Sequence, residues 1–355
     1  MSPILASGEL ILVFRWLHEK LVSTGLSPLW VELITYTVLA VGMFALLAVI
    51  ALFLVWWERK ISAHIQQRFG PMRVGWHGWY QTIMDAIKLL QKEDVRVDTR
   101  DRGVFFWAPV ICFVAAFAAY VVIPFGDGLI VADLNIGILY VMAVTTFTII
   151  SLLMAGWGSN NKYALLGGMR SAAQVVSYEV PMILSILTVV LFAGSLSMGQ
   201  IVASQQGHGI FNWFIFRVPF GPLAFITYLI TATAESNRTP FDIPEAEQEL
   251  VAGYNVEYSG MKFAMFFLAE FVNMFTVSAI ATTLFLGGWN GPFMPSWIWF
   301  LLKTLGVVFI LMIFRWTFPR LRVDQLMEFA WKFLVPLTFA NLILAAWMKY
   351  AKWYW

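Results

Sequence analysis

Six carboxylic acids lie within 23 residues of one another in a single polar segment of the chain. They are Glu235, Asp242, Glu245, Glu247, Glu249 and Glu257, and the basic residues nearby are Arg238 and Lys262. Two carboxylates about 6 Å apart repel by roughly 3 kcal/mol at an effective dielectric constant near 20, which corresponds to about two pKa units. If the segment folds inward, some of these acids would hold protons near neutral pH, so the cluster could store and transfer protons.

Part of this segment also has a simpler, structural interpretation. Asp242 precedes Glu245 by three residues, with Pro244 between them, which is the spacing of a helix N-cap and its N3 acid. These two acids could therefore serve only to begin a helix. That explanation does not extend to the other four acids.

Three further ionisable groups lie in or close to long apolar runs. We expect Glu179 about seven residues into one run, Glu270 about nine into another and Lys303 about five into a third. A charge at the centre of a bilayer costs of order 3 kcal/mol or more, so such groups indicate function. Together with the six acids they suggest a chain of protonatable sites, and a structural Glu–Lys pair is the alternative. Pro181 is expected to open the helix beside Glu179.

The apolar runs themselves are typical of membrane-spanning helices, since about 20 apolar residues cross the hydrocarbon core. Eight spans are expected: Leu29–Trp57, Val104–Phe125, Ile136–Trp157, Ala172–Leu196, Phe220–Ala234, Met261–Leu286, Ile298–Trp316 and Phe329–Tyr350. Of all residues, 60% are hydrophobic and 12% charged, against about 45–50% and about 25% in soluble domains. We therefore predict an all-α integral membrane protein with a single membrane domain over residues 1–355, and we exclude a soluble enzyme, a disordered protein and a nucleic-acid binder.

Basic residues predict the orientation of these spans. Seventeen lysines and arginines lie in or beside the odd-numbered loops, and five lie on the other side. The positive-inside rule then puts the odd-numbered loops in the cytoplasm and both termini outside. The largest cytoplasmic loops are 58–103, with an amphipathic helix expected from Trp79 to Leu90, and the acidic loop 235–260. Residues 1–28 contain a second amphipathic helix, Glu9–Lys20, which we expect on the outer face.

The sequence carries no redox centre of its own. Its one cysteine, Cys112, allows no disulfide, structural zinc or iron–sulfur cluster. The four histidines, His18, His64, His77 and His208, all lie outside the expected spans, which argues against a haem in the membrane. The sequence contains neither a dinucleotide-binding nor a P-loop motif. We therefore expect no metal site, and any electrons must be held by another subunit.

Several motifs along essentially the whole chain resemble one known family. They are Glu58-Arg-Lys60, Gln67-Arg-Phe-Gly-Pro71, Asp85-Ala-Ile-Lys88, Ala132-Asp-Leu-Asn-Ile-Gly137, Gly156-Trp-Gly-Ser-Asn-Asn-Lys-Tyr163, Ser177-Tyr-Glu179, Asn237-Arg-Thr-Pro-Phe-Asp242, Glu257-Tyr-Ser-Gly260, Phe266-Phe-Leu-Ala-Glu270 and Pro319-Arg-Leu-Arg322-Val-Asp-Gln325. The sequence with these motifs resembles the family of the H subunit of bacterial NADH–quinone oxidoreductase, the respiratory complex I component equivalent to mitochondrial NADH dehydrogenase subunit 1.

The resemblance implies a role for each matched residue. The residues implied to line or order the membrane part of a quinone-binding chamber are Arg59, Arg68, Asp85, Arg238 and Arg315. The acids implied to begin a proton-translocation path are Glu179, Glu235, Glu245, Glu247, Glu249, Glu257 and Glu270, to which the residue pattern itself adds Asp242 and Lys303.

The resemblance also implies a setting. The substrate is a quinone (ubiquinone or menaquinone), and quinone reduction is coupled to proton pumping in the bacterial inner membrane. FMN, the iron–sulfur clusters and the quinone headgroup ligands belong to partner subunits. The implied partners are the peripheral-arm quinone-site and iron–sulfur subunits, the small membrane subunits that lead to antiporter-like subunits, and the lipid bilayer.

Three other interpretations stay open at this point. The membrane subunit of an energy-converting hydrogenase is related but uses no quinone, and the complete motifs of both cytoplasmic loops favour complex I instead. A stand-alone secondary transporter would use Glu179, Glu270 and Lys303 as an ion site, although no inverted repeat is visible. A purely structural membrane anchor would keep its activity when the acids are neutralised.

Overall fold

The computed structural model describes residues 18–23, 27–95, 97–207, 209–243, 249 and 251–351. Within these ranges the chain is helical and contains no strand, which confirms the all-α class. The long helices are α2 (Pro28–Ile65), α4 (Arg102–Ala118), α5 (Gly137–Gly158), α6 (Lys162–Ala193), α10 (Gly260–Phe285) and α11 (Ser296–Thr317). The shorter helices are α3 (Gln81–Gln91), α7 (Met198–Ala203), α8 (Phe220–Glu235), α12 (Val323–Glu328) and α13 (Val335–Tyr350).

Single turns connect several of these helices. They are the 3-10 turns η2 (Trp76–Gly78), η3 (Ala119–Val121), η4 (Gly209–Asn212), η5 (Phe214–Phe216) and η6 (Gly253–Asn255). A π-helical segment, η7 (Phe329–Leu334), joins α12 to α13, so these three elements form one continuous helical stretch.

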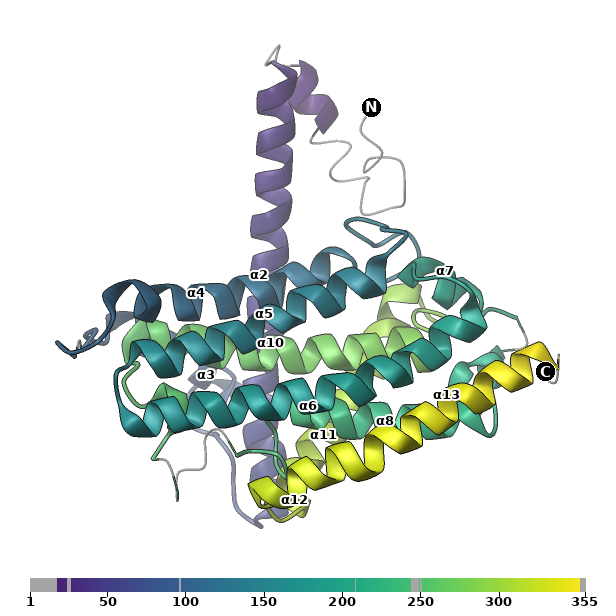
Figure 1. Ribbon diagram of the computed structural model, residues 1–355. Coiled ribbons are helices and arrows are strands. Elements are labelled where there is room, and N and C mark those ends of the chain that lie inside the picture. Colours follow the sequence, from purple (N-terminus) through teal and green to yellow (C-terminus); the bar gives the residue numbers. More distant parts are fainter. Residues whose placement is uncertain are drawn as a thin grey trace.

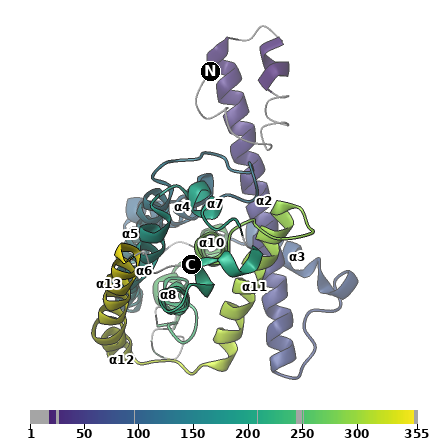
Figure 2. The same ribbon diagram turned by 90° about the vertical axis from the view of Figure 1, so that its right-hand side faces the viewer.

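The bundle is organised around α10. Helices α4, α5, α6 and α13 run side by side, whereas α2 crosses them steeply, and its N-terminal half stands clear of the other long helices (Figure 1). The end-on view shows α10 in the middle of the bundle, between α4, α8, α11 and α2 (Figure 2).

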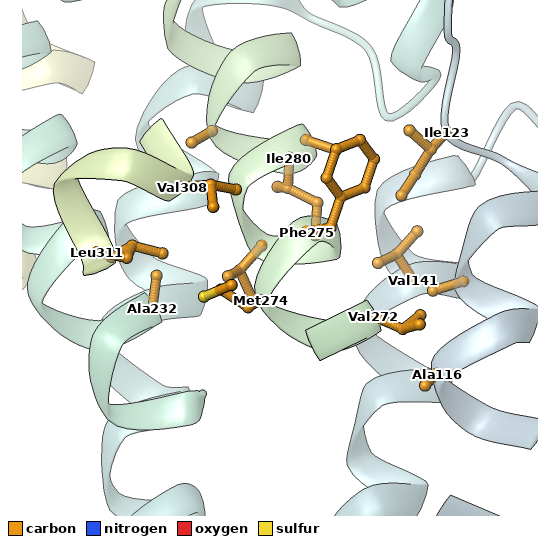
Figure 3. Close-up of a cluster of buried hydrophobic side chains, with 14 of the residues drawn as sticks. Ala116, Ile123, Val141, Ala232, Val272, Met274, Phe275, Ile280, Val308 and Leu311 are labelled. Atoms are coloured by element: carbon orange, nitrogen blue, oxygen red, sulfur yellow. The ribbon is translucent and has the colours of Figure 1, made fainter. Parts of the chain in front are cut away.

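The sequence of α10 explains its central position. Every residue from 271 to 285 is buried, and this stretch is apolar or small on all sides, as expected for a helix enclosed by others. Its side chains point in opposite directions (Figure 3). Met274 faces Val308 of α11 and Ala232 of α8, whereas Val272 faces Ala116 of α4.

Glycines bring α5 and α6 into close contact. A Cβ at Gly156 would lie 2.7 Å from the carbonyl oxygen of Ala164, and a Cβ at Gly168 would lie 2.9 Å from that of Leu152. Neither position has room for a side chain, which is how small residues let membrane helices approach. This contact fixes α6, which carries Glu179, against α5.

Among the described residues, seven helical stretches are long and apolar enough to cross a membrane. They correspond to every expected span except the fifth, which is α8. At 16 residues, α8 is about 24 Å long, shorter than the roughly 30 Å hydrocarbon core. Its residues from 231 to 235 are all buried in the bundle, where a short helix is tolerated because protein surrounds it.

Three local expectations about the helices were wrong. Helix α6 begins at Lys162 rather than Ala172, so Glu179 lies 17 residues into it rather than about seven. The helix also continues through Pro181 without the expected opening. Helix α2 does not end at Trp57 but continues to Ile65, so Glu58 lies within a helix.

The two expected amphipathic helices have different outcomes. Helix α3 confirms the one in loop 58–103, and its apolar residues Ile83, Met84, Ile87 and Leu90 are exposed on this chain. Of the N-terminal one, only residues 18–20 fall among the described residues, and these are helical.

Candidate functional site

A buried cluster of four charged side chains joins three helices and the loop after α8. Arg238 donates hydrogen bonds of 2.8 Å to both carboxylate oxygens of Glu58, and its other terminal nitrogen lies 3.0 Å from Glu270 Oε1. Arg315 donates a further hydrogen bond to Glu58. Two acids and two bases therefore balance in charge, and Glu58 is shared between both arginines.

Each member of the cluster is placed by a different element. Glu58 is buried because α2 continues past the apolar run, and Glu270 lies on the central helix α10. Arg315 comes from the last turn of α11. Arg238 follows α8 where the chain turns, with its backbone N–H bonded to the carbonyl oxygen of Thr233, and its guanidinium lies 4.7 Å from the ring centre of Phe271.

The exposure of the four side chains is graded. The side chains of Arg238 and Glu58 are 1% and 8% exposed, Glu270 is 20% exposed, and Arg315 is 36% exposed. Buried ion pairs of this kind are costly to break, because removal of one partner leaves an uncompensated charge at a cost of about 3–5 kcal/mol. The Arg238–Glu58 pair is therefore the enclosed centre of the cluster, and Arg315 is its most accessible member.

A cavity lies beyond Glu270 and reaches Glu235 at the end of α8. It measures about 40 Å³, and its lining includes Glu235, Glu270, Asn273, Thr148 and Cys112. A single water needs about 10–15 Å³ of such space, so the cavity can hold two or three waters. Glu235 is buried, and its Oε2 has no hydrogen-bond partner among the described protein groups. An oxygen of this kind is suited to accept a proton or a water.

Glu179 lies on α6, which packs against α8, the helix that ends at Glu235: Gln174 of α6 donates a hydrogen bond of 2.9 Å to the carbonyl oxygen of Ala234. Glu179 Oε1 accepts a hydrogen bond of 2.7 Å from the hydroxyl of Thr146 on α5. The structure thus places two acids of the expected proton path, Glu235 and Glu270, around one cavity and the third, Glu179, on a helix that packs against α8.

Arg59 and Asp85 meet at the contact between α2 and α3. Arg59 Nη1 lies 2.6 Å from Asp85 Oδ2, and Gln81 donates to the other carboxylate oxygen at 3.2 Å. Arg59 and Asp85 are both about one-third to two-fifths exposed, so solvent screens this pair. Arg68 is not brought to them: it is exposed and donates to Gln66.

The other described acids of the loop, Asp242, Glu249 and Glu257, have partners outside the four-residue cluster. Asp242 pairs with Arg320 at 2.8 Å, Glu249 pairs with Arg170 at 2.7 Å, and Glu257 accepts from Asn161 at 2.7 Å. Burial raises the pKa of Asp242, and the positive charge of Arg320 opposes that rise. Glu245 and Glu247 lie outside the described residues, and so does the helix start predicted at Pro244.

Lys303 lies apart from these acids. Its ammonium group donates to the carbonyl oxygens of Leu286, Gly288 and Asn290, at 2.7, 3.0 and 2.6 Å, and sits 4.0 Å from the ring centre of Trp213. Leu286 is 16 residues beyond Glu270, or about 24 Å along the helix axis. The structural alternative, a Glu–Lys pair, is thus not formed among the described residues, and Lys303 binds backbone carbonyl oxygens.

Sequence reasoning missed Glu58 as a site residue. Its motif was recognised, but the residue was expected just beyond the end of a span, where it would be solvated. Glu58, Arg59 and Lys60 are all residues that a helix tolerates well, and this was the signal that α2 continues. Thr146 was missed as well, because nothing in an apolar run marks one threonine as the partner of a distant acid.

Comparison with known proteins identifies the family. A sequence model of the family described as NADH dehydrogenase matches residues 38–346. The chain belongs to this family. The H subunit of NADH-quinone oxidoreductase from Dehalococcoides mccartyi (strain CBDB1) is 50% identical over 324 residues, which cover 90% of this chain and 88% of that protein. The same subunit from Carboxydothermus hydrogenoformans is 47% identical over 340 residues, or 95% of each chain.

A third relative extends the comparison. The corresponding protein from Geobacillus kaustophilus, also an H subunit of NADH-quinone oxidoreductase, is 50% identical over 317 residues, covering 87% of this chain and 93% of that protein. These matches confirm the resemblance seen in the motifs. This member of the NADH dehydrogenase family is a multi-pass membrane subunit of an enzyme complex, NADH-quinone oxidoreductase.

Proposed function

We propose that this subunit forms the membrane part of the quinone-binding chamber of NADH:quinone oxidoreductase and the acidic start of its proton-translocation path. The observation that carries the proposal is the position of Arg238, whose guanidinium contacts both Glu58 and Glu270. Glu58 also contacts Arg315, the most accessible member of the cluster, and Glu270 borders the cavity that reaches Glu235. One charge cluster therefore joins the proposed chamber to the proposed path.

Quinone reduction acts on this cluster through charge. The quinone receives two electrons from an iron–sulfur cluster of a partner subunit and two protons, which together give the quinol. Before those protons arrive, the reduced quinone is an anion, and it attracts the guanidinium of Arg315. Glu58 then keeps only Arg238 as its cation, so Arg238 moves toward Glu58 and its contact with Glu270 weakens. Glu270 loses a stabilising positive charge and takes up a proton.

The proton leaves when the chamber becomes neutral again. Once the quinol is complete, Arg315 returns to Glu58, Arg238 again stabilises the ionised form of Glu270, and Glu270 releases its proton. Waters in the cavity carry that proton toward Glu235, at the end of a helix that packs against α6, which carries Glu179. The proton passes along these three acids in turn, so the path is defined by the group of them rather than by one residue.

The proposal also includes the membrane orientation of the subunit and its partner subunits. Both termini lie on the outer face of a bacterial inner membrane, which the basic residues of the odd-numbered loops support. The cytoplasmic loops meet the peripheral-arm subunits that hold the quinone headgroup ligands and the last iron–sulfur cluster. Small membrane subunits continue the proton path from Glu179 toward the antiporter-like subunits.

Two variants test the two halves of the proposal in membrane vesicles that contain the whole complex. Arg315→Gln should lower inhibitor-sensitive NADH:quinone activity at least tenfold, whereas Glu235→Gln should lower proton pumping more than electron transfer. Electron transfer from NADH to an artificial acceptor that bypasses the quinone site reports on assembly and should stay unchanged. Glu328→Gln is the matched control, since this acid is exposed and pairs with the exposed Lys332. Normal quinone activity and normal pumping in both variants would refute the proposed function.

A further inference from the structure

The hydroxyl of Thr146 lies between two acceptors. Its Oγ1 is 2.9 Å from the carbonyl oxygen of Met142, one helical turn earlier in α5, and 2.7 Å from Glu179 Oε1 on α6. A hydroxyl has one proton to donate and two lone pairs that accept. Thr146 can therefore satisfy only one of these two acceptors at a time. Among the described residues, it is the hydrogen-bond partner found for the Glu179 side chain.

We infer that Thr146 is a positioning residue whose hydroxyl turns between Glu179 and the Met142 carbonyl and so sets the pH at which Glu179 exchanges its proton. This inference rests on the proposed function, because it assumes that Glu179 gains and loses a proton during pumping. An ionised Glu179 accepts the hydroxyl proton. A protonated Glu179 donates its own proton to Thr146 Oγ1, and the hydroxyl proton turns to Met142.

Only one covalent bond to hydrogen changes in this exchange. The O–H bond of the Glu179 carboxylic acid forms when the path delivers a proton and breaks when the path removes it. The Thr146 O–H bond stays intact, and its proton only rotates. The hydrogen bond between Thr146 and Glu179 is kept in both protonation states, with donor and acceptor exchanged. A valine at this position would support neither arrangement.

The surroundings of Glu179 contain few other groups that could take this role. The titratable groups on the elements that pack against α6 are Tyr140 on α5, Tyr228 and Glu235 on α8, Tyr254 in η6, Lys262 and Glu270 on α10, Asp324 and Glu328 on α12, Lys332 in η7, and Lys349 and Tyr350 on α13. Lys332 pairs with Glu328, and Lys349 donates to the carbonyl oxygen of Leu191. No hydrogen bond between the side chains of Glu235 and Glu179 is found in the described structure, so Glu235 does not take the positioning role of Thr146.

The test is the pH profile of proton pumping in vesicles with Thr146→Val. Without the hydroxyl the ionised form of Glu179 loses its donor, so proton release needs a higher pH. The hydrogen bond to the charged form is stronger than the one to the neutral form, and the valine variant loses both, so the midpoint of the acidic limb should move up by about one pH unit. Thr146→Ser keeps a hydroxyl and should return the midpoint to its wild-type position.

Thr145→Val is a matched control on the same turn. Thr145 is buried, and its hydroxyl donates at 3.1 Å to the same Met142 carbonyl, but no contact joins it to Glu179 in the described structure. Its midpoint should stay unchanged. If Thr146→Val does not assemble, Thr146→Ala and Thr146→Ser provide the same comparison, with a shift expected only for alanine.

Glu179→Gln separates failure of this inference from failure of the proposed function. Normal pumping in Glu179→Gln would show that the path does not use Glu179. This result would refute the proposed function as far as Glu179 is concerned. If Glu179→Gln stops pumping but Thr146→Val or Thr146→Ala leaves the midpoint in place, the inference about Thr146 alone is overturned. An equal shift in Thr145→Val, or a shift in Thr146→Ser, would overturn it too.

Discussion

Arg238 donates two hydrogen bonds of 2.8 Å to the carboxylate of Glu58, a residue 180 positions earlier in the chain, and both side chains are almost completely buried. The pair connects the loop after α8 to the C-terminal part of α2. Because Glu270 contacts Arg238 and Arg315 contacts Glu58, a change of charge at one end of the cluster alters the electrostatic balance at the other.

Arg238→Gln should destabilise the subunit strongly. It leaves Glu58 with Arg315 alone and removes the contact to Glu270, and breaking a buried pair in this way costs about 3–5 kcal/mol. We expect little assembled complex on native gels and a lower melting temperature for what assembles. Lys332→Gln is the control, because its exposed pair with Glu328 contributes about 1 kcal/mol or less. Equal amounts and equal melting temperatures for the two variants would contradict the proposed role of Arg238.

Asp85→Asn should leave the complex assembled but weaken its use of quinone. The Arg59–Asp85 pair is partly exposed, so its loss should change stability by about 1 kcal/mol or less. If α3 and Arg59 border the chamber, freeing Arg59 from Asp85 should raise the KM for quinone several-fold. Steady-state kinetics with a short-chain quinone measures this, with electron transfer to an artificial acceptor as the assembly control. An unchanged KM would place this pair outside the chamber.

The helices were predictable where hydrophobicity alone determines them. Helix α10 was expected within one residue at each end, because its apolar run coincides with its buried length. Helix α6 was expected ten residues too late, since its first turns carry Lys162 and Arg170. The side chain of Asn161, which caps α6 by accepting from the N–H of Tyr163, was the local signal for the earlier start.

The site was harder to predict than the helices. The acids Glu179 and Glu270 were identifiable, because a carboxylate in an apolar run demands a partner. Their partners were not, since Arg238 meets Glu270 only through the packing of α8 against α10, and Thr146 meets Glu179 only through the packing of α5 against α6. For Lys303 the sequence suggested the proton path, with an acid partner as the alternative, and could not show that backbone carbonyl oxygens at and beyond the end of α10 bind it.

Asp242 predicts a pH dependence of stability. Burial raises its pKa above the value of about 4 in an unfolded chain. The folded protein therefore binds this proton more tightly than the unfolded chain does. The resulting stabilisation is present below pH 4 or so and is lost as pH rises through the raised pKa. The melting temperature of Asp242→Asn should thus improve relative to wild type as pH rises from about 4 to 7. A relative melting temperature that falls over this range would mean that the pairing with Arg320 outweighs burial.

Lys303→Met should reduce the amount of assembled complex and leave the efficiency of pumping unchanged. The substitution leaves the carbonyl oxygens of Leu286, Gly288 and Asn290 without their common donor, at a cost of roughly 1–3 kcal/mol for each buried group left unsatisfied. Native gels give the amount, and the ratio of protons pumped to NADH oxidised gives the efficiency. Normal assembly with a lower ratio would instead make Lys303 a step of the proton path.

The number of protons pumped per NADH oxidised in Glu270→Gln tests most directly whether the charge cluster couples the chamber to the path. Glutamine keeps the size and polarity of Glu270 but cannot exchange a proton, and Arg238 retains Glu58. We predict that reconstituted Glu270→Gln complex is assembled, that quinone reduction slows, and that the proton ratio falls well below that of Glu328→Gln measured in parallel. A wild-type ratio in Glu270→Gln would contradict the role of the cluster in coupling.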